Sequence, residues 1–93
     1  MMFIHMSLHY PKEEYKPQLR DSMNRFKESL KNCDGFIDGY VLEDEITGLF
    51  VGMIKWISKE HMENNIHLSV EAIKNDDRDE WELKPHHTFY LND

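Results

Sequence analysis

Two histidines, His5 and His9, stand four residues apart in a segment whose side chains alternate between two characters. Alternation over residues 2–10 predicts a β-strand, in which every second side chain points to the same face. His5, Ser7 and His9 therefore share a face, and the two imidazoles lie about 13 Å apart, too far to bind one metal ion. Either histidine is a candidate general base, lines a cleft, or pairs with an acid across a dimer. The other face is strongly apolar: Met2, Ile4, Met6, Leu8 and Tyr10.

Other reactive residue types stand at less informative positions. His86 and His87 are adjacent, and neighbours on a strand point to opposite faces, so we interpret them as a polar strand entry rather than a metal site. No nucleophile motif, Gly-rich phosphate loop or zinc-ligand spacing occurs, and no bound metal or flavin is expected. The single Cys33 excludes an internal disulfide, and a lone cysteine near a helix end is expected to be inert.

The elements that position these residues follow from hydrophobic periodicity. Apolar residues at helical spacing predict one helix over about 14–32 and another over about 59–74. Two apolar segments joined by the turn-rich EDEITG predict a β-hairpin, and the acidic NDDRDE predicts a solvated loop. The predicted strands cover residues 2–10, 36–43, 49–57 and 86–91.

Three residues give local signals for the ends of these elements. Pro17 suits the first turn of the first helix, where no backbone donor is lost. Gly35 suits the left-handed conformation that ends a helix. Ser58 is a good N-cap for the second helix.

The order β-α-β-β-α-β predicts an α+β fold of the ferredoxin-like type, a single domain over residues 1–93. In this fold both helices cover one face of a four-stranded antiparallel sheet. The strand over 49–57 is nearly apolar throughout, so its other face needs a cover too. We expect a second copy of the chain to supply it, giving a homodimer in which two sheets face each other as a barrel.

Charge and hydropathy narrow the expected partners. The net charge of −7 and the absence of a basic patch argue against nucleic acid. No apolar run is long enough to span a bilayer, and the N-terminal MMFIHMSLHY does not resemble a signal peptide. We therefore expect a cytoplasmic protein whose partners are itself and a small-molecule ligand.

Several segments together resemble a known family. An N-terminal strand ends in HYP, MNRF lies late in the first helix, DGF leads into the second strand, IKWISKEHMENN joins the third strand to the second helix, and DEWELKP follows. In these features the chain resembles the antibiotic biosynthesis monooxygenase-like domain of the dimeric α/β-barrel superfamily. The resemblance implies the ferredoxin-like fold and the dimer. The family includes cofactor-independent oxygenases of aromatic polyketides, isomerases and haem-degrading enzymes, and these are the activities that the resemblance implies.

Cofactor-independent oxygenation needs a base, hydrogen-bond donors and an apolar wall around an electron-rich phenol. The candidates are His5 or His9 as base, Asn65 and Tyr40 as donors, and Trp56 as wall. Trp56 also suits a core position at a strand end, and Asn65 also suits a solvated helix surface. The expected function is monooxygenation or isomerisation of a small aromatic or polyketide-like metabolite.

Two other functions stay open on the sequence. A non-catalytic module would hold a small molecule in the same cleft. A haem-binding or haem-degrading protein is less compatible with the residues, because Ser7 and Leu8 stand where that branch carries Asn. Asn65 stands in place of its Trp, and SVEAIKN lacks its His.

Overall fold

The computed structural model describes residues 2–93 and has the predicted order of elements, with two short additions. A 3₁₀ turn, η1, precedes the first helix, and a four-residue helix, α3, lies where the sequence predicted a solvated loop. In chain order the elements are β1 (Phe3–His9), η1 (Glu13–Tyr15), α1 (Lys16–Glu28), β2 (Phe36–Glu43), β3 (Phe50–Trp56), α2 (Lys59–Ala72), α3 (Arg78–Trp81) and β4 (His87–Asn92).

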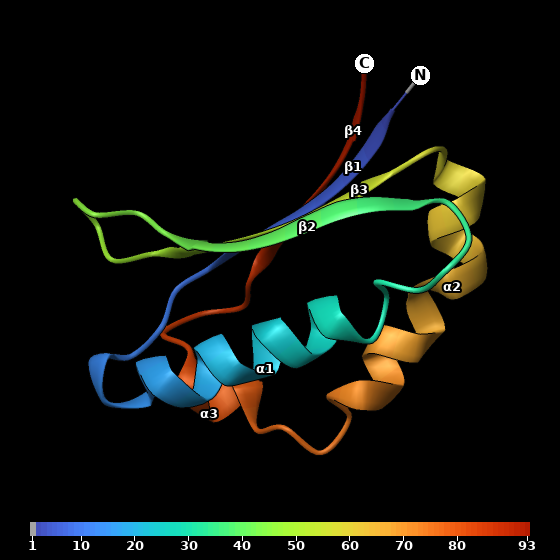
Figure 1. Cartoon of the computed structure of the whole chain (residues 1–93). Helices are drawn as coiled ribbons and strands as arrows, with labels where there is room; N and C mark the ends of the chain where they lie inside the picture. The colour runs from blue at the N-terminus through green and yellow to red at the C-terminus, as the bar shows by residue number, and fades with distance from the viewer. Residues whose placement is uncertain (1) are drawn as a thin grey trace.

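The four strands form one antiparallel sheet in the order β2-β3-β1-β4, and α1 and α2 lie on the same side of it (Figure 1). This confirms the ferredoxin-like α+β fold. In the register of β1, Ser7 pairs with Gly52 on β3 and with Thr88 on β4. Since side chains alternate between faces, His5, Ser7 and His9 all point to the helix side.

The first helix forms largely as its sequence indicates. Leu19 and Met23 are buried beneath the sheet, and Pro17 occupies the first turn. The helix ends at Glu28, earlier than predicted, and turns follow up to Gly35. Gly35 does adopt a positive φ of 86°, but at the entrance to β2, where a Cβ atom would lie 2.3 Å from the His61 ring.

The second helix begins as predicted, since the Ser58 hydroxyl accepts a hydrogen bond from the His61 backbone N–H at 3.2 Å. Its apolar stripe is only partly in the core. Met62 is buried, whereas Val70 is 56% exposed. The later turns of α2 therefore leave space between themselves and the sheet.

The hydrophobic core has two clusters rather than one. The larger contains Phe3, Leu30, Ile54, Trp56 and Met62, and the smaller contains Leu19, Met23 and Phe50. Side chains from both clusters border the space under the sheet.

Within the described residues, no element covers the sheet face away from the helices. Its strands carry apolar side chains there, including Ile4, Met6, Leu8, Leu42, Val51, Met53, Phe89 and Leu91. Among residues 2–93, no helix is both long and apolar enough to cross a bilayer.

Candidate active site

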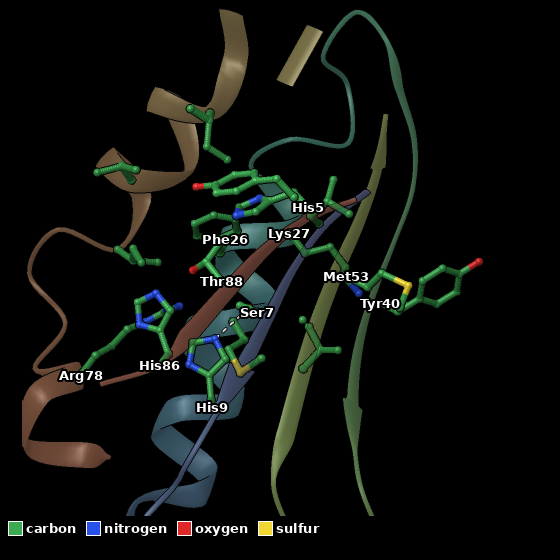
Figure 2. Close-up of a pocket in the computed structure, with 18 residues that line it drawn as sticks. His5, Ser7, His9, Phe26, Lys27, Tyr40, Met53, Arg78, His86 and Thr88 are labelled. Atoms are coloured by element: carbon green, nitrogen blue, oxygen red, sulfur yellow. Dashed lines mark hydrogen bonds between the residues drawn. The ribbon is translucent and has the colours of Figure 1, made fainter. Parts of the chain in front are cut away.

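A cavity of about 310 Å³ lies between the sheet and the helices (Figure 2). Its walls are mainly apolar, and its polar side chains come mostly from β1 and from the segment between α2 and β4. The lining residues are His5, Ser7, His9, Met23, Phe26, Lys27, Tyr40, Val41, Gly52, Met53, Ile54, Ile66, Val70, Ile73, Arg78, His86, Thr88 and Tyr90. Size and lining suit a small, mostly apolar ligand.

His5 projects into this cavity between two aromatic rings. Its imidazole stacks on Tyr90, with centroids 5.3 Å apart and an angle of 4°, and it lies 6.2 Å from the ring of Phe26. Nδ1 of His5 is buried without a hydrogen-bond partner in the described part of the chain. Burial, with a smaller contribution from His86, lowers the pKa of His5 below its ordinary value. His5 is therefore a neutral imidazole at pH 7 with an unused polar atom.

His9, at the other end of β1, has both ring nitrogens engaged. Nδ1 lies 3.1 Å from Glu82 Oε2, and Nε2 lies 2.9 Å from Ser7 Oγ. Burial alone would raise the pKa of Glu82, but hydrogen bonds from His9 and from the Tyr10 backbone outweigh it and hold this pKa below its ordinary value. Because the carboxylate accepts, Nδ1 carries a proton, and in the neutral imidazole Nε2 then accepts from the Ser7 hydroxyl.

Backbone pairing places Glu82 beside His9. Lys12 N–H donates to the Trp81 carbonyl at 2.9 Å, and Leu83 N–H donates to the Tyr10 carbonyl at 2.8 Å. Between these bonds, Tyr10 N–H donates to Glu82 Oε1 at 2.9 Å. The result is a carboxylate only 6% exposed, with both oxygens hydrogen-bonded.

Arg78, from α3, brings a cation to the same cavity. Its Nε donates to Ser22 Oγ at 2.9 Å, while Nη2 is buried without a partner among the described residues. Burial lowers the pKa of Arg78, yet a guanidinium stays protonated at neutral pH. Its Cζ lies 5.9 Å from the Phe26 ring centroid, so Arg78 and His5 flank the same aromatic side chain.

His9, Glu82 and His86 offer ligand atoms within 4.8 Å of one another, a two-nitrogen, one-carboxylate set of the kind that Zn²⁺ and Fe²⁺ accept. The rings of His9 and His86 are stacked, with centroids 4.9 Å apart and an angle of 17°. Lone pairs in nearly parallel planes do not converge on one point. An ion would need the exposed His86 to rotate and one His9 hydrogen bond to break.

Of the five predicted site residues, His5 and His9 line the cavity with their imidazole rings. Tyr40 belongs to the cavity wall only through its position on β2, because its phenol points away from the cavity (Figure 2) and donates to Asp38 Oδ2 at 2.6 Å. Trp56 is fully buried in the core, edge-on to Phe36, and does not line the cavity.

Asn65 also lies outside the cavity lining. Its amide donates to the carbonyls of His61 at 2.8 Å and Asp34 at 3.3 Å, which ties α2 to the turn before β2. Sequence reasoning did not select Ser7, Glu82, Arg78 and His86. Ser7 had a signal, since it shares the period-two face of His5 and His9, and His86 was interpreted as part of a polar strand entry with His87.

No family model and no curated protein matches the sequence. Solved structures match over nearly the whole chain. Rv0793 from Mycobacterium tuberculosis is 13% identical with a TM-score of 0.85, covering 100% of this chain and 95% of that one. A conserved protein from Methanosarcina mazei Go1 is 14% identical with a TM-score of 0.82, covering 98% and 91%.

An antibiotic biosynthesis monooxygenase of known structure is 9% identical with a TM-score of 0.78, covering 100% of this chain and 98% of that one. At these identities the comparisons show the fold. The ferredoxin-like fold predicted from the sequence is thereby confirmed.

Proposed function

We propose that the protein is a cofactor-independent monooxygenase, or a related isomerase, of a small aromatic or polyketide-like metabolite. His5 is the catalytic base. One observation carries this proposal: a neutral histidine with an unpartnered, buried Nδ1 faces a mainly apolar cavity. A buried polar atom without a partner loses about 1–3 kcal/mol, which the hydroxyl of a bound phenol or enol would recover.

Proton transfer from such a hydroxyl to His5 leaves an electron-rich anion in the cavity. The anion itself passes an electron to O₂ in the oxygenase, or is reprotonated at carbon in the isomerase. Arg78 stabilises the anion, because its free Nη2 donor belongs to the same cavity. Arg78 thus takes the donor role that the sequence suggested for Asn65 and Tyr40.

The apolar wall protects the anion from water. Phe26 stands between base and cation, and Ile66, Val70 and Ile73 line the side formed by α2 and its end. In such surroundings the charge interaction between Arg78 and the anion is stronger than in water. Neither step uses a flavin or a metal ion.

The test is turnover of an electron-rich polycyclic phenol under ¹⁸O₂, with anaerobic samples as controls. We expect labelled product, unchanged by EDTA, and a loss of about 10²–10⁴-fold in His5→Gln. His67→Gln, on the exposed side of α2, is the matched control and keeps full activity. Saturable binding without product would favour the binding module, and full turnover by a folded His5→Gln protein would refute the role of His5.

The proposal includes a homodimer formed through the uncovered sheet face. Met6 lies near the middle of this face, paired with Met53 on one side and Phe89 on the other. Met6→Lys should convert the dimer to a monomer in sedimentation velocity at micromolar concentration. A native chain that sediments as a monomer would contradict the dimer. The lone Cys33 suits a reducing cytoplasm, where we place the protein.

A further inference from the structure

The end of the cavity opposite His5 holds a continuous hydrogen-bond relay, Ser7 Oγ–H to His9 Nε2 and His9 Nδ1–H to Glu82 Oε2, at 2.9 and 3.1 Å. The order of atoms is that of a hydroxyl nucleophile, its base and a carboxylate that orients the base. The relay is rigid, since His9 is 1% and Glu82 6% exposed. The second oxygen of Glu82 is fixed by Tyr10 N–H.

The relay opens into the cavity at Ser7. Ser7 points to the helix side of β1 and is one of the lining residues. On β3 its neighbour is Gly52, where a Cβ atom would lie 2.9 Å from Ser7 Oγ. The absent side chain gives the hydroxyl room to stay on His9 while a ligand approaches from the cavity, on the helix side of the sheet.

Two groups that line the same cavity as Ser7 can stabilise a developing oxyanion. Thr88 is the direct cross-strand neighbour of Ser7 and lines the cavity, and such neighbours have Cβ atoms about 5 Å apart. Arg78 adds a buried donor, Nη2, without a protein partner among the described residues. A hydroxyl, a base, an orienting carboxylate and oxyanion donors together make up the set that acyl transfer requires.

We infer that Ser7, His9 and Glu82 form a second active centre that hydrolyses small, neutral carboxylic esters or lactones. Ser7 and His9 are the catalytic residues, and Glu82 is a positioning residue. The cavity of about 310 Å³ accepts a small apolar acyl group. The net charge of −7 disfavours substrates whose leaving group is anionic, such as thioesters of a phosphorylated thiol.

Both half-reactions balance without a further reagent. Ser7 Oγ attacks the ester carbonyl as its proton passes to His9 Nε2. The C–O bond to the alcohol then breaks, and the alcohol leaves with that proton. Water attacks the acyl-Ser7 carbonyl and gives a proton to His9. The acyl C–Oγ bond breaks, the carboxylic acid leaves, and Ser7 regains the proton.

The experiment measures p-nitrophenyl butyrate hydrolysis and covalent labelling by an alkyl fluorophosphonate, with the labelled residue located by peptide mass spectrometry. We expect the label on Ser7 and a loss of about 10²-fold or more in Ser7→Ala. Ser69→Ala is the matched control: Ser69 is also a small hydroxyl residue on a regular element, but its Oγ donates only to the Ile66 carbonyl. It should hydrolyse and label normally.

Glu82→Gln tests the positioning role through a pH profile. An amide keeps the shape of the side chain but stabilises a protonated imidazole less well. The pH of half-maximal labelling should therefore move downward, which a purely structural role would not produce.

Three results would overturn the inference. The native protein neither hydrolyses the ester nor takes up the label; folded Ser7→Ala hydrolyses at the native rate; or Ser7→Ala and Ser69→Ala lose activity equally. Circular dichroism of each variant establishes folding. Oxygenase activity lost in His5→Gln tests the other end of the cavity and gives no information on Ser7 labelling.

Discussion

His5 and His9 lie on one face of β1, four residues apart, and both line the same cavity. His9 has a hydrogen-bond partner for each ring nitrogen, and its carboxylate partner is itself held by a backbone N–H. His5 has aromatic neighbours instead, and its Nδ1 has no partner in the described part of the chain. The same residue type is therefore held by fixed hydrogen-bond partners at one end, and open to a ligand at the other.

The comparison shows that the neighbours, rather than the strand position, decide what each imidazole can do. Around His9, the loop from α3 to β4 brings a carboxylate under the sheet. Around His5, β4 and α1 bring the aromatic rings of Tyr90 and Phe26. A stability measurement should separate the two ends as clearly as an activity measurement.

Glu82→Ala should have the largest effect. It leaves His9 Nδ1–H and Tyr10 N–H buried without partners, which costs about 3 kcal/mol in the free energy of unfolding. His5→Phe replaces the imidazole, whose Nδ1 has no partner in the described part of the chain, with an apolar ring and should be nearly neutral. The midpoint of urea denaturation measures both.

Glu80→Ala is the control for Glu82→Ala. Glu80 is an exposed acid two residues away whose ion pair with Lys12 spans 3.6 Å, so its loss should cost no more than about 0.5 kcal/mol. Equal stability losses in Glu82→Ala and His5→Phe would contradict the proposed difference between the His9 end and the His5 end of the cavity.

Gly52→Ala should have the second largest effect. The new Cβ would lie 2.9 Å from Ser7 Oγ and 3.2 Å from Met23 Cε, and the hydroxyl cannot withdraw without leaving His9. We expect a loss of about 1–2 kcal/mol from overpacking. In a Ser7→Ala background the penalty should shrink, because the closest contact is gone. An unchanged penalty in that background would show that Met23, not Ser7, fixes the need for glycine.

The third largest effect should appear in the pH dependence of stability, to which His5 contributes. Burial lowers the pKa of His5 in the folded chain, so between the folded and unfolded values the unfolded chain binds more protons. The contribution of His5 to the free energy of unfolding is therefore complete above about pH 6.5, the ordinary pKa of histidine in the unfolded chain. It is lost as the pH falls through the lowered pKa of the folded chain. Burial also lowers the pKa of His86, so this group makes stability depend on pH in the same direction.

His5→Phe isolates the His5 share of this titration. The slope of unfolding free energy against pH, measured in urea from pH 7.5 to 4.5, should be shallower in the variant than in the native protein. Parallel slopes would mean that His5 does not titrate differently in the folded and unfolded chains.

Much of the fold, and the shared face of His5 and His9, can be predicted from the sequence. The alternation of residues 2–10 records that one face of β1 is apolar and the other mixed, so the shared face of the two histidines follows from period two alone. The hairpin and both helices follow equally from local periodicity. The antiparallel order of strands follows from the order of elements.

Tyr40 shows where local reasoning fails. The register shifts by one residue between Phe36 and Asp38, so Tyr40 pairs with Met53 and faces away from the helices. Without this bulge, alternation from Phe36 would put Tyr40 on the cavity side, because one extra residue moves every later side chain to the opposite face. Gly39, a residue type that often marks a bulge or a close approach, lies beside the shift, but it does not fix which residue is the extra one.

Glu82 and Arg78 were missed for a different reason. Arg78 lies in NDDRDE, whose acidic composition is that of a solvated loop, and Glu82 lies just after it in DEWELKP. Backbone pairing of residues 81–83 with residues 10–12 places Glu82 beside His9. That pairing joins positions about seventy residues apart, so no window of sequence contains it.

Tyr90→Leu should have the smallest effect and gives the finest test of the His5 end. Tyr90 is 58% exposed, but its ring stacks on His5 at 5.3 Å from the neighbouring strand. Loss of the stacked pair should cost about 0.5–1 kcal/mol. Because the smaller side chain admits water to the imidazole, the pKa of His5 should move upward, toward its ordinary value, in an NMR titration. A His5 titration unchanged by the loss of Tyr90 would show that the remaining cavity wall alone excludes water from that ring.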